Sequence, residues 1–198
     1  MKILLAEDQS MVRGALAALL GMEEGFEVTQ AEDGDKAWML LRQHTFDILL
    51  ADIEMPGRSG LELAQWAINQ KLPIKIIIIT TFGRAGYIRR AIEMGVNGFL
   101  LKDAPSEQLI EAIYKVMDGK KVIDGELAMM AVGESDPLND KERRALRLAA
   151  EGKTTADIAN TLHLSEGTVR NYLSEAIAKL NAANRVDAAR IARQKGWI

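Results

Sequence analysis

The chain has 198 residues, 48% of them hydrophobic and 27% charged, and this balance indicates a folded globular protein rather than a disordered one. The sequence contains no cysteine, which excludes disulfides and thiolate metal sites and is typical of a reducing cytosol. The first apolar run ends at Glu7 and Asp8, too early for a signal peptide, and no segment approaches the roughly 20 apolar residues of a membrane span. We therefore expect a cytoplasmic protein without membrane insertion.

The net charge of −3 is unevenly distributed along the chain. From residue 138 onward there are 11 Lys and Arg against 7 Asp and Glu, whereas the preceding residues hold 14 against 21. An acidic front and a basic end predict different partners for the two parts. The basic excess is small, so by itself it supports nucleic-acid binding only weakly.

Short apolar runs alternate with helical patterns through the first 120 residues. The expected strands are residues 2–6, 27–31, 48–51, 74–79 and 98–101, and the expected helices are residues 11–20, 36–42, 61–69, 85–94 and 107–117. Five repeats of strand and helix predict an α/β fold with a doubly wound, five-stranded parallel sheet. Gly21 and Gly95 stand where helix C-caps are expected.

This rhythm ends at residues 119–137, where three glycines and a proline predict a linker with a short helix around residues 126–130. The pattern of residues 138–198 is wholly helical and predicts a small all-α domain. Gly152 is expected to close the first of its helices. The helix N-caps are expected at Asn139 with its partner Glu142, at Thr155, at Ser165 and at Asn184.

Side chains able to bind cations and phosphate follow four of the five expected strands. Glu7 and Asp8 follow the first, Asp52 ends the third, Thr80 ends the fourth and Lys102 ends the fifth. Because the carboxyl ends of parallel strands meet at one edge of a sheet, three carboxylates would share a small space. Two like charges ~4 Å apart repel by ~4 kcal/mol at an effective dielectric near 20, and Mg²⁺ would offset that repulsion. Taken singly, each acid is explained as well by helix capping or loop solvation as by metal binding, but coincidence is a poor explanation for residues of this kind after four different strands.

The cation of Lys102 and the hydroxyl of Thr80 suit a phosphoryl group that develops charge on its oxygens. The motifs "AEDQ", "LLADIEMPG", "IIIITTF" and "GFLLKD" resemble, in order and spacing, the receiver domain of two-component response regulators over residues 1–118. The resemblance implies a flavodoxin-like fold in which Asp52 accepts phosphate from a sensor histidine kinase. Asp103 stands where many receivers have proline, so the loop after it is expected to differ in shape.

The same resemblance implies roles for the neighbouring residues. Glu7 and Asp8 would hold Mg²⁺ together with Asp52 and the backbone carbonyl of Glu54. Thr80 and Lys102 would bind the phosphoryl oxygens. Phe99 would move into space that Thr80 vacates, although plain core packing is the simpler explanation for this residue.

Phosphorylation adds charge at one point, and it acts as a switch only if some element has two arrangements. We expect the phosphorylated receiver to change a surface, so that homodimers form or are released from inhibition. The first and fifth helices offer apolar surface for this contact. The residues that would form this surface are Met11, Ala15, Ala18 and Leu19. The alternative is that these residues face the sheet.

The helix expected after Ser165 has two different stripes. The inward stripe is Val169, Tyr172, Leu173, Ala176, Ile177 and Leu180, and the outward stripe is Gly167, Arg170, Asn171, Ser174 and Ala178. The outward stripe suits a DNA major groove, where Arg reads guanine and Asn reads adenine. The preceding segment "TADIANTLHL" has inward positions at Ile158, Ala159 and Leu162 and turns at His163, which predicts a helix-turn-helix.

Residues 138–198 resemble the LuxR-type DNA-binding domain, and a receiver followed by this domain defines the NarL/FixJ family. Asn139 replaces the usual threonine cap, and Ser174 occupies a position that is often basic. The implied partners are an operator in double-stranded DNA and, as a further candidate, RNA polymerase. The segments "TTFGRAGY", "GTVRNY" and "KGW" further resemble regulators of membrane-lipid desaturation genes. The candidate DNA contacts are Ser165, Thr168, Arg170, Asn171, Ser174 and Lys179.

Two other functions are compatible with parts of this pattern. A Mg²⁺-dependent phosphatase of the haloacid-dehalogenase type also uses an aspartate nucleophile. Such enzymes carry a D-x-D motif, whereas here Glu54 stands two residues after Asp52. The sequence also shows no substrate-capping insertion. We therefore expect no enzyme. A regulator that binds DNA independently of phosphorylation is the second alternative.

Overall fold

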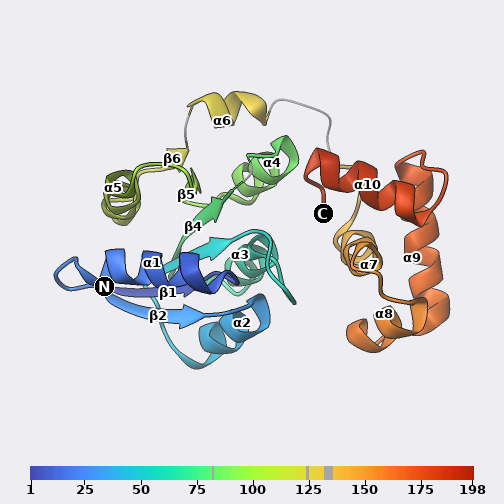
Figure 1. Cartoon of the computed structure of the whole chain (residues 1–198), viewed down its shortest axis with the longest axis horizontal. Helices are drawn as coiled ribbons and strands as arrows, with labels where there is room; N and C mark the ends of the chain where they lie inside the picture. Colours follow the sequence, from blue (N-terminus) through green and yellow to red (C-terminus); the bar gives the residue numbers. More distant parts are fainter. Residues whose placement is uncertain (82, 124, 132–135) are drawn as a thin grey trace. The chain divides into compact units, whose positions relative to one another are not determined.

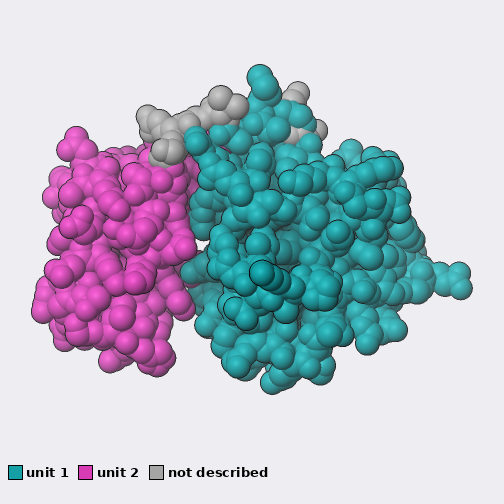
Figure 2. Space-filling model, turned by 180° about the vertical axis from the view of Figure 1, so that it is seen from behind, with its two compact units in different colours: residues 1–83, 87–131 teal, residues 84–86, 132–198 magenta. Residues whose placement is uncertain are grey.

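The structure is a computed structural model that describes residues 1–81, 83–123, 125–131 and 136–198, with the side chains of residues 126 and 130 excepted. The chain divides into two compact units, residues 1–83 with 87–131 and residues 84–86 with 132–198 (Figure 2). Parts of the expected linker, at 124 and 132–135, lie outside the described residues. Within the part described, no helix combines the length and the apolar character that a membrane crossing requires.

The first unit is built on a parallel sheet with the order β2-β1-β3-β4-β5-β6 (Figure 1). Its strands are β1 (Lys2–Ala6), β2 (Glu27–Ala31), β3 (Ile48–Asp52), β4 (Lys75–Thr80), β5 (Gly98–Leu101) and β6 (Val122–Ile123). The doubly wound parallel fold expected from the sequence is confirmed, but the expected number of five strands is wrong by one. The sixth strand lies in the segment expected to be a linker, where Val122 pairs with Gly98, and two residues are too few to give an apolar run.

Helices cover both faces of this sheet. On one face lie α1 (Ser10–Gly21) and α5 (Ser106–Met117), packed on side chains such as Leu5 and Leu50. On the other lie α2 (Gly34–Gln43), α3 (Gly60–Asn69) and α4 (Ala85–Met94), packed on side chains such as Leu4 and Leu49. Because the central strands are buried on both faces, their sequences are continuous apolar runs that end in polar residues.

Two glycines were expected to cap helices in this unit, and the structure confirms only one of these expectations. Gly95 has φ +82 directly after α4, so a residue without Cβ suits this position. Gly21 is the last residue of α1, and the C-cap is Met22 in the right-handed conformation. The expectation for Gly21 is therefore wrong, because this helix ends without a left-handed residue at its C-cap.

The expected short helix is present as α6 (Gly125–Met130), and the second unit is helical as expected, with α7 (Asp140–Ala150), α8 (Thr155–Leu162), α9 (Glu166–Lys179) and α10 (Arg185–Lys195). Its core is formed by one cluster of side chains from α7, α8, α9 and α10. Central members of the cluster are Leu146, Ile158, Val169, Leu173 and Ala188.

The N-caps of the second unit follow the sequence at three of four positions. Asn139, Ser165 and Asn184 each accept a backbone N–H of the first turn of their helices. The cap of α8 is Thr154 rather than Thr155, because Thr154 Oγ1 accepts the backbone N–H of Asp157 at 3.2 Å. A capping pattern in the sequence locates a helix start only to within about one residue, so it cannot distinguish two adjacent threonines.

Candidate functional site

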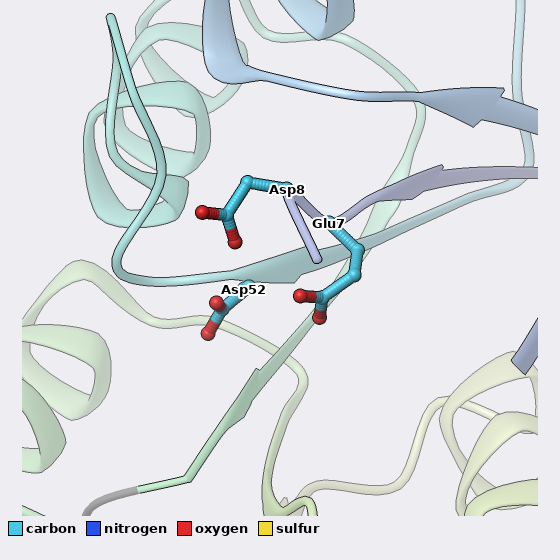
Figure 3. A group of neighbouring side chains, drawn as sticks. All are labelled: Glu7, Asp8 and Asp52. Atoms are coloured by element: carbon cyan, nitrogen blue, oxygen red, sulfur yellow. The ribbon is translucent and has the colours of Figure 1, made fainter. Parts of the chain in front are cut away.

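Three carboxylates converge at the carboxyl edge of the sheet (Figure 3). Glu7 and Asp8 follow β1, and Asp52 is the last residue of β3. Strands β1 and β3 are hydrogen-bonded neighbours, with Ala6 opposite Ala51, so their ends lie side by side. One oxygen from each carboxylate lies within 4.8 Å of the others. The sheet therefore gathers residues that are 44 positions apart in the sequence into one acidic cluster.

Lys102, directly after β5, supplies the cation of this cluster. Its Nζ lies 2.6 Å from Glu7 Oε2 and 2.9 Å from Asp52 Oδ2. The side chain of Glu7 is fully buried, whereas that of Asp52 retains 5% exposure and that of Lys102 retains 10%. The carboxylate of Asp52 is thus deep but not fully sealed from solvent.

Burial raises the pKa of Asp52 to about 6, although the ammonium of Lys102 opposes that rise. Burial lowers the pKa of Lys102, but the adjacent carboxylates of Glu7 and Asp52 outweigh burial and raise it above its ordinary value. At neutral pH the site therefore holds an ionised Asp52 beside a charged Lys102. An ionised carboxylate next to a cation is a competent nucleophile toward an electrophilic phosphorus.

The loop after Asp52, residues 53–59, is fixed close to the site. The backbone N–H of Ile53 donates to Asp52 Oδ1 at 2.7 Å, and the N–H of Gly60 donates to the carbonyl of Ile53 at 3.2 Å. A Cβ on Gly60 would lie 2.1 Å from the carbonyl oxygen of Asp52. Only glycine therefore fits at the start of α3, where the helix passes over the end of β3.

The other residues expected at this site are placed as follows. Thr80, the last residue of β4, is buried, and its carbonyl accepts the backbone N–H of Lys102 at 2.8 Å. Phe99 is fully buried in the core cluster on the α2, α3 and α4 face. Asp103 is exposed in the turn after β5.

Glu54 lies in the loop after Asp52, with its side chain exposed. The hydroxyl of Tyr87 on α4 donates to Glu54 Oε1 at 2.9 Å. This contact could not be predicted from sequence, because a tyrosine within a helix of mixed polarity resembles any half-apolar core residue. It connects the loop that follows Asp52 to a different helix of the same unit.

The residues around Asp52 fit a bound Mg²⁺ ion. This cation prefers a few carboxylate oxygens together with waters, and the cluster offers three carboxylates. Asp8 Oδ1 is buried and accepts no hydrogen bond within the part of the chain that the structure describes. A buried acceptor without a donor is costly unless a cation satisfies it, so the donor set agrees with a hard divalent ion.

The outer side of α1 is apolar and turned to solvent. Met11 is 86% exposed, and Ala15 and Ala18 are exposed as well, whereas Leu19 is half-buried and packs on the core. The alternative that these residues all face the sheet therefore holds only for Leu19. A groove of about 310 Å³ lies between α1 and α5, with Leu16 and Leu109 in its lining.

In the second unit, α8 and α9 form a helix-turn-helix. His163 ends α8 in the left-handed conformation with φ 54, and two residues later Ser165 caps α9. The inward positions of α8 and α9 are buried or half-buried, as expected. The five outward residues of α9 are all exposed, namely Gly167, Arg170, Asn171, Ser174 and Ala178.

Three other candidate DNA contacts have partners within the unit. Ser165 Oγ lies 2.9 Å from Thr168 Oγ1, and it caps α9 by accepting the backbone N–H of Thr168. Lys179 Nζ lies 2.8 Å from each carboxylate oxygen of Glu142, whose side chain is 4% exposed. The ammonium of Lys179 thus neutralises a buried carboxylate that also caps α7, a role that helical spacing alone does not reveal.

Comparison with known proteins agrees with this two-part organisation. The family model of the response regulator receiver domain matches residues 3–114, and that of the luxR family of bacterial regulatory proteins matches residues 136–192. The transcriptional regulatory proteins YvfU and DesR of Bacillus subtilis are 48% and 45% identical to the chain, over 100% and 99% of its length and 99% and 98% of theirs. A solved structure of the Salmonella typhimurium RcsB response regulator shares the fold, with a TM-score of 0.77 at 23% identity over 98% of both chains.

The acidic cluster with its lysine and the helix-turn-helix are the two candidate functional features of the chain. Each family model covers the unit that carries the corresponding feature. The two Bacillus relatives match the chain over nearly its whole length, so the order of the two parts is shared as well. The chain therefore belongs to the NarL family of two-component response regulators, with a receiver domain followed by a LuxR-type DNA-binding domain.

Proposed function

We propose that a sensor histidine kinase transfers phosphate to Asp52 in the cytoplasm, and that this phosphorylation switches dimerisation and sequence-specific DNA binding to regulate transcription. The observation that carries the proposal is the convergence of Lys102 with Glu7, Asp8 and Asp52 at one edge of the sheet. In this proposal residues 1–118 are the phosphoacceptor domain, residues 119–137 are the linker and residues 138–198 bind DNA.

In the transfer step an oxygen of the Asp52 carboxylate attacks the phosphorus of a phosphohistidine, forming an O–P bond. The N–P bond breaks, and its electron pair stays with the departing imidazole. Lys102 neutralises the acceptor carboxylate and then faces the phosphoryl oxygens, to which the Thr80 hydroxyl donates. Mg²⁺, held by Glu7, Asp8, Asp52 and the carbonyl of Glu54, would neutralise the remaining charge on the phosphoryl group.

The first unit also offers a surface for the phosphorylated dimer. The exposed stripe of Met11, Ala15 and Ala18 and the groove beside it supply apolar area that a second copy of the chain would cover. In a symmetric dimer the same patch is used by both copies. Movement of Phe99 into space that Thr80 vacates is the proposed response of this unit to the phosphoryl group.

The second unit supplies the output. The exposed Arg170 and Asn171 of α9 are proposed to read guanine and adenine in the major groove, with Ser174, Ser165, Thr168 and Lys179 nearer the backbone. Paired domains of a dimer would occupy half-sites about one helical turn apart. On the sequence resemblance noted above, genes of membrane-lipid desaturation are the proposed targets, and RNA polymerase is the proposed further partner.

The proposal is tested by labelling with radioactive acetyl phosphate. We expect wild-type protein to take up one phosphate per chain in MgCl₂ and almost none in EDTA, and Asp52→Ala to take up none. Labelling of Asp52→Ala, or phosphate uptake by wild-type protein that is unchanged by EDTA, would contradict the proposed site. Release of many phosphates per chain from a phosphate ester would indicate a phosphatase instead.

A further inference from the structure

The loop after Asp52 is fastened at its far end to the beginning of α2. The backbone N–H of Gly34 donates to the carbonyl of Pro56 at 3.1 Å. A Cβ on Gly34 would lie 1.7 Å from the carbonyl oxygen of Arg58, and one on Gly57 would lie 2.5 Å from Asp35 Oδ2. Gly57 also has φ +73. Gly34 is therefore needed for the two segments to approach this closely, and Gly57 suits a backbone conformation that residues with a Cβ rarely adopt.

Arg58 connects the same two segments through its side chain. Its guanidinium forms an ion pair with Asp35, and its Cζ lies 4.2 Å from the ring centroid of Trp38 on α2. Only 24% of the Arg58 side chain is exposed. The Trp38 ring is itself held by Trp66 of α3, at 6.0 Å between centroids. A planar cation that pairs and stacks at once fixes its own backbone more firmly than a single surface ion pair would.

This loop begins at the metal site. It runs from Ile53, which donates to Asp52, through Glu54, whose carbonyl is the expected backbone ligand, to Arg58. Mg²⁺ requires nearly ideal octahedral geometry, so its affinity is sensitive to small displacements of a ligand. Partners that orient metal ligands from outside the site typically change metal affinity by 10–100-fold when they are removed. The tether between Arg58 and α2 lies four residues from the expected carbonyl ligand.

We propose that Arg58 is a positioning residue for the metal: by pairing with Asp35 and stacking on Trp38, it fixes the loop so that the Glu54 carbonyl is held in place for Mg²⁺. The inference rests on the proposed function, because it concerns the cation at the same site. It assigns a role to the surface of α2, which carries none of the residues that were expected to bind phosphate or metal.

The test compares Arg58→Ala with Arg42→Ala. Arg42 is the matched control because its Cζ also lies near the Trp38 ring, at 4.6 Å, but it belongs to α2 itself and not to the loop. The readouts are the melting temperature as a function of MgCl₂, which gives the half-saturating concentration by linkage, and the rate of labelling by acetyl phosphate. We expect Arg58→Ala to raise the half-saturating Mg²⁺ concentration by about 10-fold, with labelling restored at saturating Mg²⁺, and Arg42→Ala to match wild type.

Asp35→Asn and Arg58→Lys are measured in the same way, so that the test does not depend on one variant folding. Asp35→Asn should weaken Mg²⁺ binding like Arg58→Ala, and Arg58→Lys should lie between, because lysine keeps the charge but not the planar fork. If folded variants lose thermal stability but keep the wild-type Mg²⁺ dependence, Arg58 is merely structural and the inference is wrong. If wild-type protein itself neither responds to Mg²⁺ nor is labelled, the proposed function fails instead.

Discussion

The Asp52 carboxylate is held in surroundings that oppose its charge. Its side chain is 5% exposed, and Glu7 beside it is fully buried, so the two acids depend on Lys102 for compensation. Burial accordingly raises the pKa of Asp52 to about 6. The ionised form of Asp52 therefore lowers the stability of the folded state, which is typical of a residue kept for its chemistry.

This loss of stability predicts a pH-dependent effect of Asp52→Asn. The pKa of Asp52 is about 6 in the folded protein against an ordinary 3.8, so the folded state binds the additional proton between about pH 4 and 6. Ionisation of Asp52 therefore lowers the stability of wild-type protein as pH rises through this window, whereas asparagine does not titrate. In EDTA we expect Asp52→Asn to be more stable than wild type by about 1–3 kcal/mol above pH 6, and the difference to shrink toward pH 4. Urea unfolding at several pH values measures this, and a difference independent of pH would contradict it.

The pairing of Lys179 with Glu142 predicts a loss of stability when the lysine is removed. Lys179→Ala would leave the buried Glu142 carboxylate without its cation, at a cost of about 1–3 kcal/mol in the free energy of unfolding, since the ammonium is partly exposed. Lys141→Ala, which removes an exposed lysine of α7, is the control and should change little. If Lys179→Ala unfolds at the wild-type urea concentration but loses DNA affinity, the lysine acts at the DNA and not within the core.

At the scale of the elements, most of the fold follows from local patterns. Apolar runs of four to six residues ending at Asp52 or Thr80 indicate buried parallel strands, and the cap at Asn139 indicates the start of α7. The convergence of Glu7, Asp8 and Asp52 could be predicted as well, because parallel strands place their carboxyl ends at one edge.

What the sequence does not reveal are contacts that depend on the tertiary fold. Strand β6 is only two residues long and exists because β5 offers it a free edge. The tether from Arg58 to Asp35 and Trp38 joins positions 20 or more residues apart, and no periodic pattern connects them. The hydroxyl of Tyr87 donates to Glu54 only because the fold brings α4 close to the loop after Asp52.

The outward face of α9 predicts how DNA binding divides between base and backbone contacts. If Arg170 reads a guanine, Arg170→Ala should weaken binding to a selected operator by about 1–3 kcal/mol and relax the preference at one base pair, with little change on random DNA. Arg190→Ala, an exposed arginine of α10, controls for the loss of one positive charge. Binding selections and affinity measurements with both variants decide the matter, and an equal loss on operator and random DNA would assign Arg170 to a phosphate.

At the scale of the whole molecule, the uneven charge of the sequence matches the division into two units. The acidic front contains the receiver with its carboxylate cluster, and the basic end contains the helix-turn-helix. Because the basic excess is small, DNA affinity is expected to need two copies of the domain. The logarithm of that affinity should fall with the logarithm of salt concentration by ~0.9 per phosphate contacted.

The proposed phosphorylation switch is tested by the operator affinity of wild type and Asp52→Ala with and without beryllofluoride, in MgCl₂. Beryllofluoride stands in for the phosphoryl group on an aspartate. We expect beryllofluoride to tighten operator binding and to promote dimers of wild-type protein, and to leave Asp52→Ala unchanged. Equal affinity of wild-type protein in both conditions, with beryllofluoride bound, would contradict the switch and establish a regulator that binds DNA independently of phosphorylation.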